Sequence, residues 1–377
     1  MYTFNDNVTT GGATGDYFGR SLVSGDFNAD GKADLAVGAS GYSSSTGRAY
    51  IFYGGSALDV SGSTADITIT GEASSYFGTS LATGDLNADG EIDLVVGAAS
   101  LTGSVYIFYN DGSIPTTAAT ADVIITGEAS GDIFGRVLAT GDLNADGETD
   151  LAVGAYGYSS AAGRAYIFYN DGSLPTTAAT ADVAINGEAS SAFGSTLNSS
   201  DLNADGKVDL VVGAENYASL TGRAYIFYND GSIPTTGATA DVIISASTVG
   251  QLFGDTLTAG DLNADGKADL VVGSWDASSL TDNVYVFYND GTYPSLASSA
   301  DKIFSGSTTG EDFGLAIAVA DMNIDGKPDL VAGAPGYSSS TGRVYTFITE
   351  TTVTATETKA AEFKGSSGVI KGSFELK

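Results

Sequence analysis

A nine-residue pattern of Asp, Asn and Gly recurs six times in the 377-residue chain, and its residue types suit metal binding. In the first copy, DFNADGKAD, side-chain oxygens stand at positions 1, 3, 5 and 9, and Gly31 at position 6 permits a sharp turn. Position 7 adds a backbone carbonyl. Calcium takes about six to eight oxygen ligands, and alternate positions of a tightly curved loop bring such oxygens to one point. Magnesium fits less well because it tends to keep its waters. The pattern therefore predicts about six Ca²⁺ ions, one per loop.

The predicted calcium ligands occupy positions 1, 3, 5, 7 and 9 of every loop. They are Asp26, Asn28, Asp30, Lys32 and Asp34; Asp85, Asn87, Asp89, Glu91 and Asp93; Asp142, Asn144, Asp146, Glu148 and Asp150; Asp201, Asn203, Asp205, Lys207 and Asp209; Asp261, Asn263, Asp265, Lys267 and Asp269; and Asp321, Asn323, Asp325, Lys327 and Asp329. One such pattern could be an ordinary turn, but six intact copies favour a metal. The pattern starts like an EF-hand loop, yet it ends with Asp at position 9, and its flanks have the pattern of strands.

The composition agrees with this interpretation and excludes several functions. Asp and Glu number 46 against 15 Lys and Arg, for a net charge of −31, and the chain has no Cys and no His. Disulfides, Cys/His zinc sites and His-based triads are therefore impossible, and nucleic-acid binding through phosphate contacts is disfavoured. Carboxylates crowded into one loop repel each other, so bound calcium is expected to stabilise the fold.

Each loop is expected to join two short strands of a repeated unit. The dipeptide FG recurs at spacings of 57 to 60 residues, at Phe18, Phe77, Phe134, Phe193, Phe253 and Phe313. In the second unit, strands are predicted over 77–85, 93–98, 105–109 and 121–126, since these runs are β-branched or aromatic and bounded by turn residues. The middle strands are apolar on both faces, so the sheets must be covered on both sides. This predicts an all-β fold, a β-propeller of six four-stranded antiparallel blades. A linear solenoid is the alternative.

The combination of FG, DxNxDGxxD, VGA or GAP, and GRxYxF resembles the FG-GAP repeat of integrin α-subunit β-propellers and their bacterial relatives. The last unit, 313–347, keeps the GAP tripeptide at Gly333–Pro335. The resemblance covers roughly residues 8–347 and implies calcium in every intact loop. Two features depart from it. Integrin-type propellers have seven blades, whereas six repeats are visible here, and the fifth unit has Gly273–Ser274 followed by Trp275. No inserted metal-binding adhesion domain is present, so integrin-like ligand recognition does not follow from the resemblance.

The two ends of the chain contain one candidate strand too many. We expect a propeller over 1–348, closed by an N-terminal strand, and an extension over 349–377 with one or two extra strands. Both 7–19 and 360–368 resemble the missing fourth strand of the sixth unit. Four alternatives follow: a degenerate seventh blade built from both ends, a tail that packs on its own ring, a tail that pairs with the next molecule, or a solvated terminus. Segment 359–377 holds four Lys and two Glu.

The face opposite the calcium loops is the predicted ligand face. Its loops carry aromatic side chains suited to a protein or glycan ligand, namely Tyr42, Tyr158, Tyr217, Trp275 and Tyr337. The competing interpretation is that these rings pack between blades. We expect no enzyme, because the recurring carboxylates belong to the loops and no other catalytic set is visible. The expected function is calcium-dependent adhesion or protein interaction. The alternatives are a surface filament or matrix subunit that exchanges a terminal strand, with self-association through the tail, and a carbohydrate-binding propeller.

The expected cellular location follows from the predicted calcium sites. Loops of moderate ligand charge suit the millimolar calcium found outside cells, so we expect an extracellular or cell-surface protein. The lack of Cys favours a prokaryotic source. No apolar run is long enough for a membrane span, and the start MYTFNDNVTTGG lacks the features of a signal peptide.

Overall fold

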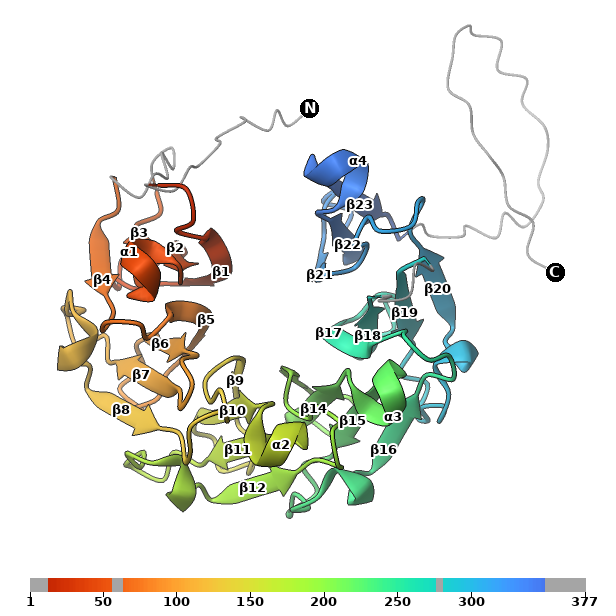
Figure 1. The fold of residues 1–377 in the computed structure, drawn as a ribbon, viewed down its shortest axis with the longest axis horizontal. Coiled ribbons are helices and arrows are strands. Elements are labelled where there is room, and N and C mark those ends of the chain that lie inside the picture. Colours follow the sequence, from red (N-terminus) through yellow and green to blue (C-terminus); the bar gives the residue numbers. More distant parts are fainter. Residues whose placement is uncertain (1–12, 56–63, 276–280, 350–377) are drawn as a thin grey trace, which may run out of the picture.

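The computed structural model describes residues 13–55, 64–275 and 281–349. Within them, six antiparallel sheets are arranged as the blades of a propeller (Figure 1). The predicted all-β propeller fold is thus confirmed, and the solenoid alternative is wrong. The predicted N-terminal closing strand and the extension predicted over 349–377 lie almost wholly outside the described residues. Only residues 13–19 and Thr349 of these two segments are described.

Successive strands of each blade run from the inside of the ring outward and pair with their neighbours along the chain. Blade 1 holds β1 (Phe18–Gly25), β2 (Asp34–Ala39), β3 (Arg48–Phe52) and β4 (Ile67–Thr70). Blade 2 holds β5 (Phe77–Gly84), β6 (Asp93–Ala98), β7 (Ser104–Phe108) and β8 (Val123–Thr126). Blade 3 holds β9 (Leu138–Gly141), β10 (Asp150–Ala155), β11 (Arg164–Phe168) and β12 (Val183–Asn186).

The remaining blades follow the same order. Blade 4 holds β13 (Thr196–Ser200), β14 (Asp209–Ala214), β15 (Arg223–Phe227) and β16 (Val242–Ser245). Blade 5 holds β17 (Phe253–Gly260), β18 (Asp269–Ser274), β19 (Asn283–Phe287) and β20 (Lys302–Ser305). The described part of blade 6 holds β21 (Ala316–Ala320), β22 (Asp329–Ala334) and β23 (Arg343–Phe347). The strands predicted in the second unit agree with the structure to within two residues at each end.

Only short helices interrupt the strands. Four single turns lie between the second and third strands of their blades: α1 (Tyr42–Ser45), α2 (Tyr158–Ala161), α3 (Tyr217–Leu220) and α4 (Tyr337–Ser340). Four 3-10 turns precede fourth strands: η1 (Ala118–Thr120), η2 (Ala178–Thr180), η3 (Gly237–Thr239) and η4 (Ala297–Ser299). In the described part of the chain, no helix has the length and apolar character needed to cross a membrane.

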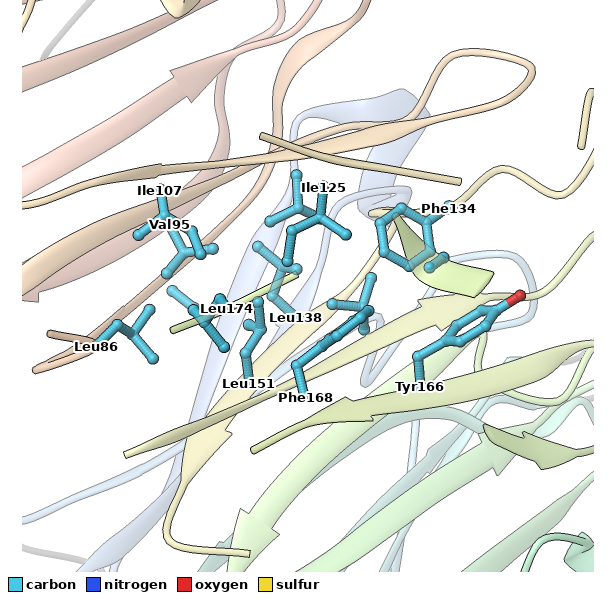
Figure 2. Packing of buried hydrophobic residues seen from close by; sticks show 14 of the residues in the cluster. Leu86, Val95, Ile107, Ile125, Phe134, Leu138, Leu151, Tyr166, Phe168 and Leu174 are labelled. Carbon is cyan, nitrogen blue, oxygen red and sulfur yellow. The ribbon is translucent and has the colours of Figure 1, made fainter. Parts of the chain in front are cut away.

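The hydrophobic core lies between neighbouring blades, as the two-sided apolar strands require. Between blades 2 and 3, Val95 and Ile107 pack toward Leu151 and Phe168 (Figure 2). The phenylalanine of the FG dipeptide, Phe134, is fully buried and meets the Tyr166 ring nearly edge-on, at a centroid distance of 5.4 Å. Aromatic pairs favour such edge contacts. Equivalent edge contacts with the third-strand tyrosine recur in blades 2, 4, 5 and 6.

The described ring is open on one side. Contacts between innermost strands run in turn from β1 through β5, β9, β13 and β17 to β21. Blade 6 then faces blade 1 across an opening (Figure 1). The strands on either side of it are more exposed than their equivalents inside the ring: no residue of β5 is exposed, whereas every second residue of β21 is exposed. Leu22 and Val344 are 61% and 67% exposed. The choice between six blades and a seventh formed by the termini depends on residues outside the described ranges.

Candidate functional site

Each predicted calcium loop joins the first and second strands of its blade, and all six have the same internal hydrogen bonds. In the third loop, Asp142 Oδ1 and Asn144 Oδ1 both accept from the Asp146 amide, at 3.0 and 2.9 Å. Asp142 Oδ2 accepts from the Gly147 amide, and Asp146 Oδ1 accepts from the amide of Glu148. The other five loops repeat these bonds. The positive φ angles of Ala145 (61°) and Gly147 (95°) curl the chain so that the side chains at positions 1, 3 and 5 turn inward.

The aspartate at position 9 has a structural role that the pattern did not indicate. Asp150 is fully buried and accepts two backbone hydrogen bonds, from Leu143 N to Oδ2 and from Asn170 N to Oδ1, both at 2.8 Å. It therefore ties the loop before β10 to the turn after β11. Burial raises the pKa of Asp150 to about 6, and the charges of Asp146 and Asp142 add to the shift. The other loops have the same tie through Asp34, Asp93, Asp209, Asp269 and Asp329.

The loops fit a hard cation in donor type and spacing. Three carboxylates, an amide oxygen and a backbone carbonyl occur within nine residues, and each carboxylate oxygen that accepts one backbone hydrogen bond keeps a second lone pair. Across residues 13–55, 64–275 and 281–349, however, no three acidic side chains lie close enough together to form a metal-binding group as they stand. In loop 1, Lys32 Nζ lies 3.0 Å from Asp30 Oδ2 and partly neutralises the cluster. Calcium binding therefore stays a prediction.

Two of the four asparagines of the NDG segments connect neighbouring blades, a role that sequence reasoning missed. Asn110 and Asn229 are almost fully buried, and their side-chain amides donate to the backbone carbonyls of Asp26 and Asp142 in the preceding blade, at 3.3 and 3.2 Å. An Asn before Asp-Gly looks the same in a free hairpin turn, so no sequence signal distinguishes the two roles.

Four of the five aromatic residues predicted to bind ligand are covered by arginines of their own blades. The guanidinium carbons of Arg48, Arg164, Arg223 and Arg343 lie 3.5 to 3.7 Å from the ring centres of Tyr42, Tyr158, Tyr217 and Tyr337. These cation–π contacts account for the four tyrosines without a ligand. Trp275 differs: its indole N–H donates to Asp312 Oδ1 at 2.9 Å, and it is 38% exposed. Its ligand role, like that of the tyrosines, stays a prediction.

The same layer holds the blades together. Glu128, which follows the last strand of blade 2, lies 2.8 Å from Arg164 Nη1 of blade 3 and accepts a hydrogen bond from the Tyr166 hydroxyl. Glu188 makes the equivalent contacts with Arg223 and Tyr225 between blades 3 and 4. On the predicted ligand face, Glu128 and Glu188 are therefore engaged within the ring.

A further group of residues, which we call the axial mouth, was not predicted. It consists of the residues that directly follow FG in the six repeats and of those that follow GA in the first four, Ser40, Ala99, Tyr156 and Glu215. They line adjoining cavities of about 770 and 410 Å³ on the face opposite the loops. The residues after FG are Arg20, Thr79, Arg136, Ser195, Asp255 and Leu315. The sequence signal that could have identified them is that the residue after FG differs from unit to unit, whereas the FG dipeptide itself recurs in all six.

One side of the axial mouth carries a carboxyl pair. Burial raises the pKa of Glu215 to about 8, and the hydrogen bond and charge of Asp255 act in the same direction. The Arg136 guanidinium opposes the shift. With the pKa of Glu215 raised to about 8, the pair carries less than two negative charges at neutral pH.

This arrangement of radial antiparallel sheets around a common axis, with an Asp-rich loop at the same point of each, defines a β-propeller of Asp-loop repeats. The FG-GAP repeat model matches residues 18–52, 77–108, 134–168 and 313–347, and the FG-GAP-like repeat model matches residues 201–272. Together the two models cover more than half of the chain. The protein belongs to the FG-GAP repeat β-propellers.

Curated relatives match part of this chain. Phosphatidylinositol-glycan-specific phospholipase D of Bos taurus is 32% identical over 237 residues, which cover 57% of this chain and 28% of that protein. Integrin alpha-PS2 of Drosophila melanogaster is 36% identical over 167 residues, covering 41% of this chain and 12% of the integrin. Integrin alpha-IIb of Mus musculus is 35% identical over 159 residues, covering 38% and 15%. The matched regions are thus less than a third of the relatives' own lengths.

Proposed function

We propose that the protein is a calcium-loaded propeller that acts outside the cell in adhesion or protein interaction, without catalysis. The observation that carries the proposal is the sixfold repetition of one loop frame with oxygen donors at positions 1, 3, 5 and 9. Bound calcium would be held by these side chains and the position-7 carbonyl, and it would supply positive charge to three neighbouring carboxylates. The integrins among the relatives support an interaction role.

The extracellular and non-catalytic parts of the proposal rest on physical arguments. Weak oxygen-only sites fill at the millimolar calcium found outside cells. The recurring carboxylates already accept backbone hydrogen bonds within the loops and, at position 9, from the turn after the third strand. They are therefore poorly placed for acid–base catalysis. One relative is named a phospholipase D, but the match covers 28% of its length, so its named activity is not part of this proposal.

Metal analysis under equilibrium dialysis tests the proposal directly. The full chain dialysed against millimolar calcium should retain about six ions per molecule, and excess EDTA should remove them and lower the melting temperature. A retained count near zero, together with a melting temperature unchanged by calcium, would refute it. Dialysis against magnesium provides the control, since magnesium should be retained weakly.

A second candidate function is favoured by the open side of the ring. In the described residues, β23 is the outer strand of blade 6, and its Val344 is 67% exposed. A terminal strand from another molecule could pair there and build a surface filament. Light scattering of the full chain and of a chain that ends at Glu357 tests this. Large assemblies that disappear on truncation would support it, and a monomeric molar mass for both chains would contradict it.

A further inference from the structure

The arginines of the chain fall into two groups. The sequence contains six of them, and four stack on the tyrosines described above. The remaining two, Arg20 and Arg136, both directly follow FG and lie two blades apart. Both line the 770 Å³ cavity of the axial mouth, with the small Thr79 of the intervening blade between them. In a chain of net charge −31, two cations thus line one cavity.

The positive charges of Arg20 and Arg136 repel each other. Burial and the positive charge of Arg136 both lower the pKa of Arg20. Guanidinium groups present planar donor pairs that match a carboxylate, and an anion between them would remove the repulsion. Among the described residues, neither guanidinium forms an ion pair, whereas Glu128 and Glu188 are paired with Arg164 and Arg223. Glu215 and Asp255 also lie in the axial mouth, but the pKa of Glu215 is raised to about 8, so this carboxyl pair does not neutralise both arginines at neutral pH. The cavity is therefore suited to an anion from outside the chain.

The rest of the cavity is suited to a polar ring. Its lining includes three tyrosines, Tyr17, Tyr76 and Tyr156, of which the first two are 66% and 43% exposed. Hydroxyl groups of Ser40, Ser74, Thr79 and Ser100 also line the cavity, as do the apolar Ala99, Leu101 and Ile133. Aromatic faces stack on the C–H faces of sugars, while hydroxyl side chains exchange hydrogen bonds with sugar hydroxyls.

We propose that the axial mouth binds a uronic acid residue, with its carboxylate between Arg20 and Arg136 and its ring against the tyrosines. The proposal rests on the interaction role proposed above and names the ligand class for the face opposite the calcium loops. In the adjoining cavity, which both arginines also line, Glu215 and Asp255 offer acceptors for further sugar hydroxyls.

A concave site favours a sugar over an acidic peptide segment of a protein partner. Small-ligand pockets have volumes of about 300–1,000 Å³, whereas stable protein interfaces are broad surfaces of about 1,200–2,000 Å². The axial cavity falls within the first range. A peptide carboxylate would use the arginines but would leave most of the hydroxyl and tyrosine lining without a partner.

Ligand-observed NMR on the calcium-loaded full chain tests the proposal with three probes: glucuronic acid, its neutral methyl ester and acetate. Glucuronic acid should bind at least tenfold more tightly than either control. Arg20→Gln and Arg136→Gln should each weaken it at least tenfold, whereas Lys302→Gln, which removes one positive charge from the exposed outer strand of blade 5, should not. Thr79→Glu should also abolish binding, because it places a carboxylate beside both arginines, and it serves if an arginine variant fails to fold.

Equal affinity for the methyl ester, or unchanged affinity in Arg136→Gln, would overturn the proposal. An Asp-rich peptide that binds at the same arginines at least tenfold more tightly than glucuronic acid would overturn it in favour of a protein partner. Melting curves with calcium and with EDTA separate this test from that of the proposed function. Glucuronic acid binding in a chain that is indifferent to calcium would refute the calcium proposal alone, and a calcium-stabilised chain without glucuronic acid binding would refute only this one.

Discussion

A β-carbon added to Gly97 would lie 2.1 Å from the carbonyl oxygen of Gly135 in the next blade. The glycine of GA on β6 and the glycine of FG on the following unit therefore form one backbone contact across the blade interface. Ser80, on the neighbouring β5, donates its hydroxyl to the same Gly135 carbonyl at 2.8 Å. The two dipeptides of the repeat are thus parts of one contact, although they belong to different units.

Gly97→Ala should destabilise the protein by about 3 kcal/mol, because the new methyl group meets backbone atoms that cannot rotate away. Urea unfolding measures the change. Gly333→Ala is the matched control: it has the same position in blade 6, where the nearest atoms to a new β-carbon are 3.6 Å away. It should be tolerated. An equally large loss in Gly333→Ala would mean that a further segment packs on blade 6 in solution.

Asp142→Ala combined with Asp146→Ala should empty the third loop alone. The two carboxylates supply positions 1 and 5 of that loop, and the six loops lie in different blades. The calcium count should therefore fall from about six to about five in metal analysis after dialysis. Asp171→Asn, an exposed aspartate of the nearby NDG segment, should leave the count unchanged. A double variant that still retains six ions would disprove the assignment of these ligands.

Calcium should raise the free energy of unfolding through linkage. Each site contributes about 2.7 kcal/mol when free calcium is 100 times its dissociation constant. The melting temperature should therefore rise with the logarithm of the calcium concentration and fall in excess EDTA, as measured by circular dichroism. The double variant described above should respond less steeply than the wild type. Curves that superimpose with and without calcium would contradict the linkage.

Asp150→Asn should destabilise the protein by about 2 kcal/mol even in EDTA. Both oxygens of Asp150 accept backbone hydrogen bonds in a buried setting, whereas an amide offers one oxygen and turns its NH₂ toward a donor. Asp142→Asn, at the more exposed position 1, should lower the free energy of unfolding mainly when calcium is present. Equal behaviour of the two variants in EDTA would show that position 9 serves the metal alone.

Stability should fall as the pH rises from about 4.5 to about 8, in part because of Glu215. Its pKa is raised to about 8 in the folded protein from an ordinary 4.5, so the folded state holds a proton that the unfolded chain has lost. The groups facing it are Asp255, Arg136, Arg20 and Tyr156.

Between pH 5 and 8.5 the free energy of unfolding of the wild type should fall by about 2 kcal/mol relative to that of Glu215→Gln. Urea titrations at the two pH values measure this. Asp111→Asn, an exposed change on the opposite face, is the control, and parallel curves for wild type and Glu215→Gln would contradict the prediction.

The repeat structure was predictable because its signals are local. A unit of about 60 residues with four apolar runs predicts four strands, and apolar residues on both faces of RAYIF require a neighbour on each side. The structure confirms both. Alternating oxygen donors around Gly147 predict a curled loop, and the hydrogen bonds of Asp142 and Asn144 show that curl. These features depend on residues within one turn or one strand, so the sequence by itself determined them.

The contacts between blades were decided only by the tertiary structure. Arg20 and Arg136 lie two repeats apart in the chain, and only the rotation between successive blades brings both into one cavity. In the same way, the buried oxygens of Asp150 accept hydrogen bonds from its own loop and from a turn 20 residues away, and Tyr158 packs under Arg164. A sequence pattern reports which residues share a strand or loop, whereas the packing of blade against blade decides which side chains meet, and hence which remain available for a ligand.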